Sequence, residues 1–160
     1  YHEDRMWAGS RTRWRKESAD CIYWRALKNH PEVEEYCKAN PDTVVFGEVF
    51  GPVQSLKYNR SEPDLMIFDI YRNGEYESVQ DFRFNKDSRH LPFVPEVAPI
   101  PTPFDMEMIA TLAEGNSVIE GATEQMMEGV VVRPMKERIE DEVGRLQLKY
   151  VSPRYLGSKD

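Results

Sequence analysis

The sequence has few cysteines and no long apolar run, and each absence excludes a class of protein. Its 160 residues include only Cys21 and Cys37, which match no metal-ligand spacing. Two cysteines exclude a disulfide-rich scaffold and are typical of reduced thiols. No segment has the length of a membrane span or the apolar core of a signal peptide. We therefore expect a protein of the cytoplasm, the nucleus or virus-infected cytosol that is not secreted.

Basic residues are outnumbered, which bears on nucleic-acid binding. The net charge is −7, from 21 lysines and arginines against 28 aspartates and glutamates. Phosphate binding depends on Lys and Arg, so this balance argues against a surface that coats DNA regardless of sequence. The charge is uneven, however, because residues 1–28 and 145–160 each carry +3 and the residues between them carry −13. A local basic surface at either end is compatible with this distribution.

Alternating apolar residues predict strands, and helical spacing predicts fewer helices. Asn73-Gly74 predicts a tight hairpin turn after one of the strands. The predicted strands cover residues 44–51, 64–71, 130–133 and 146–151. The predicted helices cover residues 19–29 and 31–38, and a third helix is capped within Thr102 to Asp105 and ends at Gly115. Without strict βαβ alternation, the pattern indicates an α+β domain of mainly antiparallel sheets flanked by a few helices.

A glutamate lies in the middle of the first predicted strand, in Phe-Gly-Glu-Val-Phe-Gly at residues 46–51. Burying this Glu48 carboxylate in an apolar strand is costly unless it meets a polar ligand or a cation. The glycines of this segment leave the opposite strand face bare, so a ligand or another backbone can approach closely. A structural ion pair or an exposed strand face is the alternative.

Two further charged residues lie on the last two predicted strands. Glu128, in Met-Glu-Gly-Val-Val-Val-Arg at residues 127–133, precedes a strand and is open to solvent or a metal. Mg²⁺ takes one or two carboxylates, and waters and phosphate oxygens complete its shell. Lys149 has no acidic neighbour in sequence, so its long side chain extends to solvent or pairs elsewhere. An ordinary exposed glutamate at a strand start is the alternative for Glu128.

A basic segment near the N-terminus, Gly-Ser-Arg-Thr-Arg-Trp-Arg at residues 9–15, contains three arginines at alternating positions. One extended strand would place Arg11, Arg13 and Arg15 on the same side, where a phosphate or an RNA backbone can bind them in bidentate fashion. A solvated basic edge strand, protected from aggregation by its charge, is the alternative.

In this order, the segments at 46–51, 127–133 and 148–152 resemble the adenylate-binding motifs of ATP-dependent RNA ligases, a family of the covalent nucleotidyltransferase superfamily. The resemblance extends over residues 9–156. It implies that residues 1–160 are a single ligase-type nucleotidyltransferase domain fragment. The implied activity joins RNA 3′-hydroxyl and 5′-phosphate ends, or a nicked duplex, through lysyl-AMP and RNA-adenylate. The implied cofactors are ATP, as the source of AMP, and Mg²⁺ or Mn²⁺.

The resemblance also implies roles on the N-terminal side of the chain. Glu48 would contact the ribose of the adenylate. Phe68 would stack on adenine, although an aromatic in an apolar strand is ordinarily a core residue. Arg11 would contact the adenylate phosphate or the RNA 5′-phosphate, with Arg13 in a secondary role.

On the C-terminal side, the resemblance makes Glu128 the metal ligand and Lys149 the cation that neutralises the α-phosphate. Many family members have a second lysine two residues before the latter, and this chain has Gln147 there. The substitution removes one cation near the pyrophosphate. We expect the four side chains Glu48, Phe68, Glu128 and Lys149 to surround one AMP-sized hollow.

The chain also departs from the family pattern in its lysines. The family attaches AMP to the lysine of a Lys-x-x-Gly motif, and none of the eight lysines here has glycine three positions later. We expect the nucleophile within about 30 residues upstream of Tyr1, one strand and a turn away, and the chain alone to be inactive in lysine adenylation. A non-catalytic adenine nucleotide- or RNA-binding fragment is one alternative. A DNA ligase or capping-enzyme relative is another, disfavoured by Arg133 where those enzymes usually have lysine.

Overall fold

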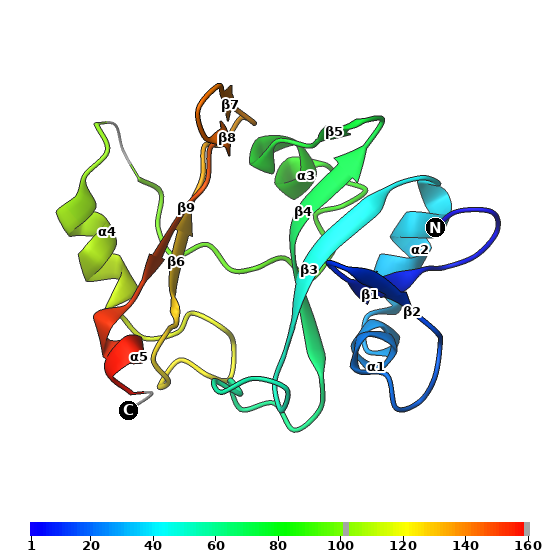
Figure 1. Ribbon diagram of the computed structural model, residues 1–160, viewed down its shortest axis with the longest axis horizontal. Helices are drawn as coiled ribbons and strands as arrows, with labels where there is room; N and C mark the ends of the chain where they lie inside the picture. The colour runs from blue at the N-terminus through cyan, green and yellow to red at the C-terminus, as the bar shows by residue number, and fades with distance from the viewer. Residues whose placement is uncertain (101–102, 159–160) are drawn as a thin grey trace. The chain divides into compact units, whose positions relative to one another are not determined.

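The computed structural model describes residues 1–100 and 103–158, and the chain divides into two compact units (Figure 1). Unit 1 is Tyr1–Val94 and unit 2 is Pro95–Asp160. Each contains small antiparallel sheets and short helices, which confirms the predicted α+β class. The single domain over residues 1–160 stays a prediction. No helix among the described residues has the length and apolarity that a membrane span requires.

Unit 1 begins with a short hairpin in which β1 (Ala8–Ser10) pairs with β2 (Arg13–Arg15). The prediction of one extended strand over residues 9–15 is therefore wrong. The chain reverses at Arg11 and Thr12, so Arg11 does not share a strand face with the arginines of β2.

Gly9 explains why the chain folds back here. It lies opposite Trp14, and a Cβ at position 9 would be 2.6 Å from the carbonyl oxygen of Arg13. Only glycine permits this close approach of the two backbones. The reversal also gives the backbone N–H and C=O groups partners that a lone strand would lack.

Two helices follow the hairpin, α1 (Ile22–Lys28) and α2 (Pro31–Ala39), and confirm two of the predicted helices. Pro31 occupies the first turn of α2, where its fixed φ favours the helix and its missing N–H has no cost. Both helices contribute to the core of unit 1 through the buried side chains of Trp24, Leu27, Val33, Tyr36 and Cys37.

The central sheet of unit 1 has the order β3-β4-β5 and is antiparallel throughout. Its strands are β3 (Val44–Phe50), β4 (Asp64–Arg72) and β5 (Glu75–Tyr76). Asn73 and Gly74 form the tight turn predicted between the last two, with φ of 56° and 88°. These positive angles are the reason that Asn-Gly is favoured in such a turn. The short helix α3 (Val79–Phe84) follows and was not predicted.

One face of this sheet is covered by helices. Ile67 and Ile70 of β4 are fully buried and form a core cluster with the apolar faces of α1 and α2 and with Val79 and Phe82 of α3. The cluster therefore fixes which side chains of β3 and β4 point inward and which lie on the other face of the sheet.

Unit 2 is built on the antiparallel pair β6 (Gly129–Val132) and β9 (Leu148–Val151) (Figure 1). The helix α4 (Met106–Ala113) packs against both strands through Ile109 and Ala113. Asp105 caps this helix by accepting a hydrogen bond from the N–H of Glu107. The strands, the helix and this cap agree with the sequence prediction, whereas Thr102 lies outside the described residues.

Two elements of unit 2 were not predicted. The charged segment between β6 and β9 contains a small hairpin, β7 (Ile139–Glu140) and β8 (Gly144–Arg145). After β9 the chain enters α5 (Pro153–Gly157), whose N-cap Ser152 accepts a hydrogen bond from the N–H of Tyr155.

Candidate active site

Glu48 lies in the middle of β3 and is exposed, in register with Met66 of β4. Its Oε1 accepts a hydrogen bond from Nε2 of Gln54 at 2.5 Å. The carboxylate is therefore not buried in the core, and its contact is with a neutral amide. A ligand hydroxyl that offers the same kind of hydrogen bond can replace Gln54.

Phe68 is placed by a β-bulge. Phe46 pairs with Asp69 and Gly47 pairs with Ile67, so Phe68 is the extra residue of β4 at the shift in register. The bulge explains why Ile67 and Ile70, three residues apart, both point into the core, since regular alternation would put them on opposite faces. Phe68 itself is 37% exposed and is therefore not a core residue.

Glu48 and Phe68 share a face of the β3–β4 pair. Met66 and Phe68 flank the buried Ile67, so both point away from the helix-covered face. Glu48 lies opposite Met66, and paired residues of antiparallel strands have their side chains on the same face. The structure thus brings together two of the predicted site residues on the sheet face that the helices of unit 1 do not cover.

The two predicted arginines lie elsewhere in unit 1. Arg11 is in the turn of the β1–β2 hairpin and Arg13 is on β2, and both are exposed. The β3–β4 pair that carries Glu48 and Phe68 is a separate sheet. The roles of Arg11 and Arg13 stay predictions.

In unit 2, Glu128 and Lys149 form an ion pair. The Nζ of Lys149 is 2.6 Å from Oε1 of Glu128, and the two side chains are 57% and 43% exposed. An ion pair this exposed contributes about 0–1 kcal/mol to stability, so it is not needed to hold the sheet together. Sequence analysis named both residues but not their contact, because they are 21 positions apart.

Gly129 fixes the backbone between Glu128 and β6. Its φ is +156°, and a Cβ at this position would be 2.0 Å from the carbonyl oxygen of Tyr150. No side chain fits there, so the glycine allows β9 to pass closely. The N–H of Ser152 donates to the carbonyl oxygen of Glu128 at 2.9 Å and holds this residue at the start of the strand.

A second charged cluster orders the segment between β6 and β9. Arg145 donates two hydrogen bonds to Glu137, at 2.8 and 2.9 Å, in a bidentate pair. Arg133 lies 3.6 Å from the same carboxylate. This cluster was not predicted from the sequence, although the alternating opposite charges of residues 134–144 were a usable signal.

The carboxylate of Glu128 suits a metal ion that binds together with the phosphates of a substrate. The described part of the chain has no group of three or more His, Cys, Asp or Glu side chains arranged for a metal. Glu128 offers one accessible carboxylate, which lies beside the ammonium of Lys149. One carboxylate is the usual protein contribution to Mg²⁺ that is bound together with phosphates and water. Glu128 therefore fits such an ion, whereas a closed protein cage is not available in the described residues.

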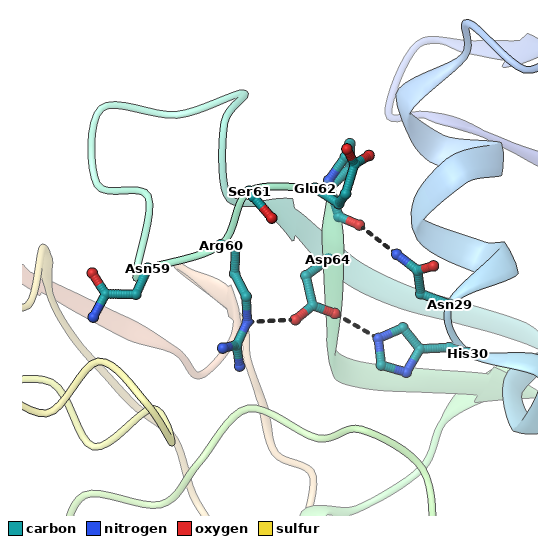
Figure 2. Close-up of a pocket in the computed structure, with 8 residues that line it drawn as sticks. Asn29, His30, Asn59, Arg60, Ser61, Glu62 and Asp64 are labelled. Carbon is teal, nitrogen blue, oxygen red and sulfur yellow. Dashed lines mark hydrogen bonds and ion pairs between the residues drawn. The ribbon is translucent and has the colours of Figure 1, made fainter.

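A pocket of about 380 Å³ lies in unit 1 and contains none of the predicted site residues. Figure 2 shows that His30 and Arg60 converge on the carboxylate of Asp64. The His30 Nε2 is 2.6 Å and the Arg60 Nε 2.8 Å from its two oxygens. The lining residues are Asn29, His30, Asn59, Arg60, Ser61, Glu62, Pro63 and Asp64.

The carboxylate at the centre of this pocket is held ionised. Burial raises the pKa of Asp64, but hydrogen bonds from His30, the Leu65 N–H and Arg60 together lower the pKa below its usual value of 3.8. His30 also contacts Glu32, with 2.9 Å between Nδ1 and Oε1. Because His30 and Arg60 both contact Asp64, this pocket is a structural connection between the α1–α2 turn and the start of β4. The contacts of His30 were not predicted from the sequence.

The comparison with protein families decides the classification. The model of the RNA ligase family matches residues 1–151. The chain belongs to the RNA ligase family. This match covers the segments at 46–51 and 127–133 and all but the last residue of the segment at 148–152.

Solved structures show the same fold as this RNA ligase family chain. A Naegleria gruberi RNA ligase variant with ATP and Mn has a TM-score of 0.70 at 19% identity, covering 95% of this chain and 47% of that one. The same ligase with PPi has a TM-score of 0.69 at 19% identity, with 95% and 47% covered. A further variant with ATP and Mn has a TM-score of 0.71 at 19% identity, with 96% and 48% covered. No curated protein matches the chain.

The chain therefore spans about half the length of the ligase structures that it resembles. The likeness confirms the ligase-type nucleotidyltransferase fold. The roles of Glu48, Phe68, Glu128, Lys149 and the arginines stay predictions, as does their arrangement around one nucleotide.

Proposed function

We propose that this chain is the adenylate-binding part of an ATP-dependent RNA ligase, which joins RNA 3′-hydroxyl and 5′-phosphate ends. The observation that carries the proposal is the Glu128–Lys149 pair, a carboxylate and an ammonium 2.6 Å apart and both accessible, within a chain of the RNA ligase family. The two charges are complementary to a metal-bound phosphate, because one meets the cation and the other meets the phosphate oxygens.

Phe68 and Glu48 of unit 1 are assigned to the recognition of adenosine. Phe68 presents an exposed ring on a rigid strand, which loses little entropy when a purine stacks on it. Glu48, on the same face, accepts a hydrogen bond from a ribose hydroxyl in place of the Gln54 amide. These residues position the nucleotide and take no part in bond breaking.

Lys149 and Glu128 of unit 2 are assigned to the phosphates and the metal ion. Lys149 leaves Glu128 and donates to an α-phosphate oxygen, which offsets the negative charge that develops at phosphorus. Glu128 is then free to hold Mg²⁺ or Mn²⁺, and the ion when bound supplies further charge neutralisation at the phosphates. Arg11 and Arg13 are assigned to the adenylate phosphate or the 5′-phosphate of RNA, where guanidinium groups bind in bidentate fashion.

The chemistry proposed for the whole protein has three steps. A lysine nitrogen attacks the α-phosphorus of ATP and releases pyrophosphate, the RNA 5′-phosphate takes the AMP from lysine, and a 3′-hydroxyl displaces AMP to form the phosphodiester. None of the eight lysines of this chain precedes a glycine by three positions. The proposal therefore assigns nucleotide binding to this chain and assigns the nucleophile to no residue within it.

That same absence favours a second candidate, an adenine nucleotide- or RNA-binding function without catalysis. Two measurements distinguish the candidates. Incubation with α-labelled ATP and Mg²⁺ shows whether the chain becomes covalently labelled, and direct titration measures its affinity for ATP. We expect metal-dependent ATP binding without a covalent label. Absence of ATP binding would contradict the proposed function, and a covalent label on this chain would show that one of its own lysines is the nucleophile.

A Lys149→Met variant gives the specific test, with Lys136→Met as the matched control. Lys136 lies in the same unit, is exposed and belongs to none of the proposed contacts. We expect ATP affinity to fall only in the first variant. Equal affinities of the two variants would contradict the role of Lys149.

A further inference from the structure

A short segment of this acidic chain is strongly basic and aromatic. Residues 5–16 contain five basic side chains and two tryptophans but no acidic residue, although the whole chain carries a net charge of −7. The basic residues are Arg5, Arg11, Arg13, Arg15 and Lys16. This segment forms the β1–β2 hairpin and the residues beside it, so its charges are concentrated on one small element.

Both tryptophans lie on the outer face of this hairpin. Gly9 pairs with Trp14, and Trp7 is two positions before Gly9, so the two indoles share a face. Ala8 points to the other face, where it packs against the core of unit 1. The outer face therefore has two indoles whose ring centroids are 6.0 Å apart, with an angle of 60° between the planes.

These indoles are open to a ligand. Trp7 is 38% and Trp14 is 65% exposed, whereas the third tryptophan, Trp24, is buried. The hairpin is held from its other side, because Nε1 of Trp24 donates to the carbonyl oxygen of Arg15 at 2.9 Å. Burying the two exposed rings is thus not required to anchor the hairpin.

One cation contacts an indole, and two more belong to the same short segment. The guanidinium of Arg5 lies 4.7 Å from the ring centroid of Trp7, in a cation–π contact. Arg11 lies in the hairpin turn and Lys16 follows β2 directly, and both are exposed. The surface therefore offers aromatic faces and positive charges within the same few residues.

A ligand that satisfies both features must itself have flat apolar faces and negative charges at close spacing. Single-stranded RNA has this chemistry, since its bases stack on aromatic side chains and its phosphates bind Lys and Arg. A duplex has the same phosphates, but its base faces are stacked on one another and are not available to indoles. The combination thus favours an unpaired strand over a helix.

We propose that this indole face, defined as Trp7 and Trp14 with Arg5, Arg11 and Lys16, binds unpaired nucleotides of the RNA substrate. The two indoles stack on bases and the three cations neutralise phosphates. The inference rests on the proposed function in taking RNA as the substrate. It adds that this hairpin contacts a single-stranded segment of that RNA.

The proposal is tested by measuring how tightly the full 160-residue chain binds an end-labelled oligouridylate. Fluorescence anisotropy at low salt measures this affinity. A duplex RNA of equal length is the comparison. We expect the single strand to bind more tightly than the duplex, and Trp14→Ala to weaken its binding about 10-fold, because each base–aromatic stack contributes on the order of that factor. Trp14→Phe should retain most of the affinity, because a ring remains.

Phe84→Ala is the matched control. Phe84 is 73% exposed at the end of α3 in the same unit and lies outside the indole face. Its removal should leave oligouridylate affinity unchanged. A loss equal to that of Trp14→Ala would show non-specific stacking and overturn the proposal.

A second readout keeps the test decisive if Trp14→Ala fails to fold. Stacking should quench the fluorescence of the two exposed tryptophans in the wild-type chain and leave that of the buried Trp24. Unchanged fluorescence on RNA binding, equal affinity for duplex, or no RNA binding would each overturn the proposal. Concentration-dependent dimerisation that Trp14→Ala abolishes would also overturn it, by showing that a second copy covers this face.

ATP titration of the same samples separates this inference from the proposed function. Trp14→Ala should bind ATP as the wild type does. If the wild type binds no ATP, the proposed function fails, whereas the oligouridylate results still decide the role of the indoles.

Discussion

The ammonium of Lys149 lies 2.6 Å from a carboxylate oxygen of Glu128, across the start of the β6–β9 pair. The proposal assigns the carboxylate to a cation and the ammonium to a phosphate. In the free chain each neutralises the other. Binding of a metal–nucleotide complex exchanges this contact for two new ones, so the net cost of breaking it is small.

Lys149→Met should weaken ATP binding by about 10-fold or more, because a charge-assisted hydrogen bond to a phosphate is lost. The melting temperature should change little, since the lysine side chain is more than half exposed. Titration calorimetry and thermal unfolding measure the two effects. ATP affinity equal to that of the Lys136→Met control would contradict the assignment.

Glu128→Gln should remove the metal dependence of ATP binding. The amide keeps the shape of the side chain but lacks the negative charge that Mg²⁺ or Mn²⁺ requires. The measurement is ATP affinity with and without EDTA, which should differ for the wild type and coincide for the variant. If EDTA changes the ATP affinity of the variant as much as that of the wild type, Glu128 is not a metal ligand.

Phe68→Leu should lower ATP affinity more than it lowers stability, because the ring is partly exposed and stacks on the purine. Phe82→Leu provides the contrast, since Phe82 is almost fully buried in the core of unit 1. We expect the latter to cost about 1–2 kcal/mol of unfolding free energy with ATP affinity unchanged. Matching losses of stability in the two variants, with ATP affinity unaffected by Phe68→Leu, would mean that Phe68 is structural.

Asp64→Asn should remove an acid-sensitive part of the stability. The folded state lowers the pKa of Asp64 below 3.8, so its contribution is fully present above that pH and is lost as pH falls through the folded pKa. Wild type and variant should therefore differ in unfolding free energy near neutral pH, and the difference should shrink as the pH falls through the lowered pKa of Asp64. Denaturant unfolding at several pH values measures this, and a difference that stays constant down to the lowest pH would contradict it.

Local signals in the sequence predicted much of the fold. Asn73-Gly74 predicted its turn because positive φ restricts the residues that fit there, and the apolar patterns predicted β3, β4, β6 and β9. Pro31 marked the first turn of α2 for a similarly local reason. Motif segments drew attention to Glu48, Phe68, Glu128 and Lys149, which the structure places on strands or at a strand start with side chains at least partly exposed, and their roles stay predictions.

Features that depend on pairing between distant residues were not predictable in this way. The bulge at Phe68 follows from how β4 aligns with β3, and nothing within β4 marks it. Alternating arginines at residues 9–15 looked like one strand because alternation alone does not show where a chain reverses. The Glu128–Lys149 contact and the Asp64 cluster likewise join residues 21 and 34 positions apart.

A titration of the isotope-labelled 160-residue chain with ATP and Mg²⁺, followed residue by residue by NMR, tests the central claim most directly. The account predicts that the amide signals of Glu48, Phe68, Glu128 and Lys149 shift together with a single Kd. Shifts at only one of the two pairs, or two different Kd values, would contradict the claim that these residues bind one nucleotide.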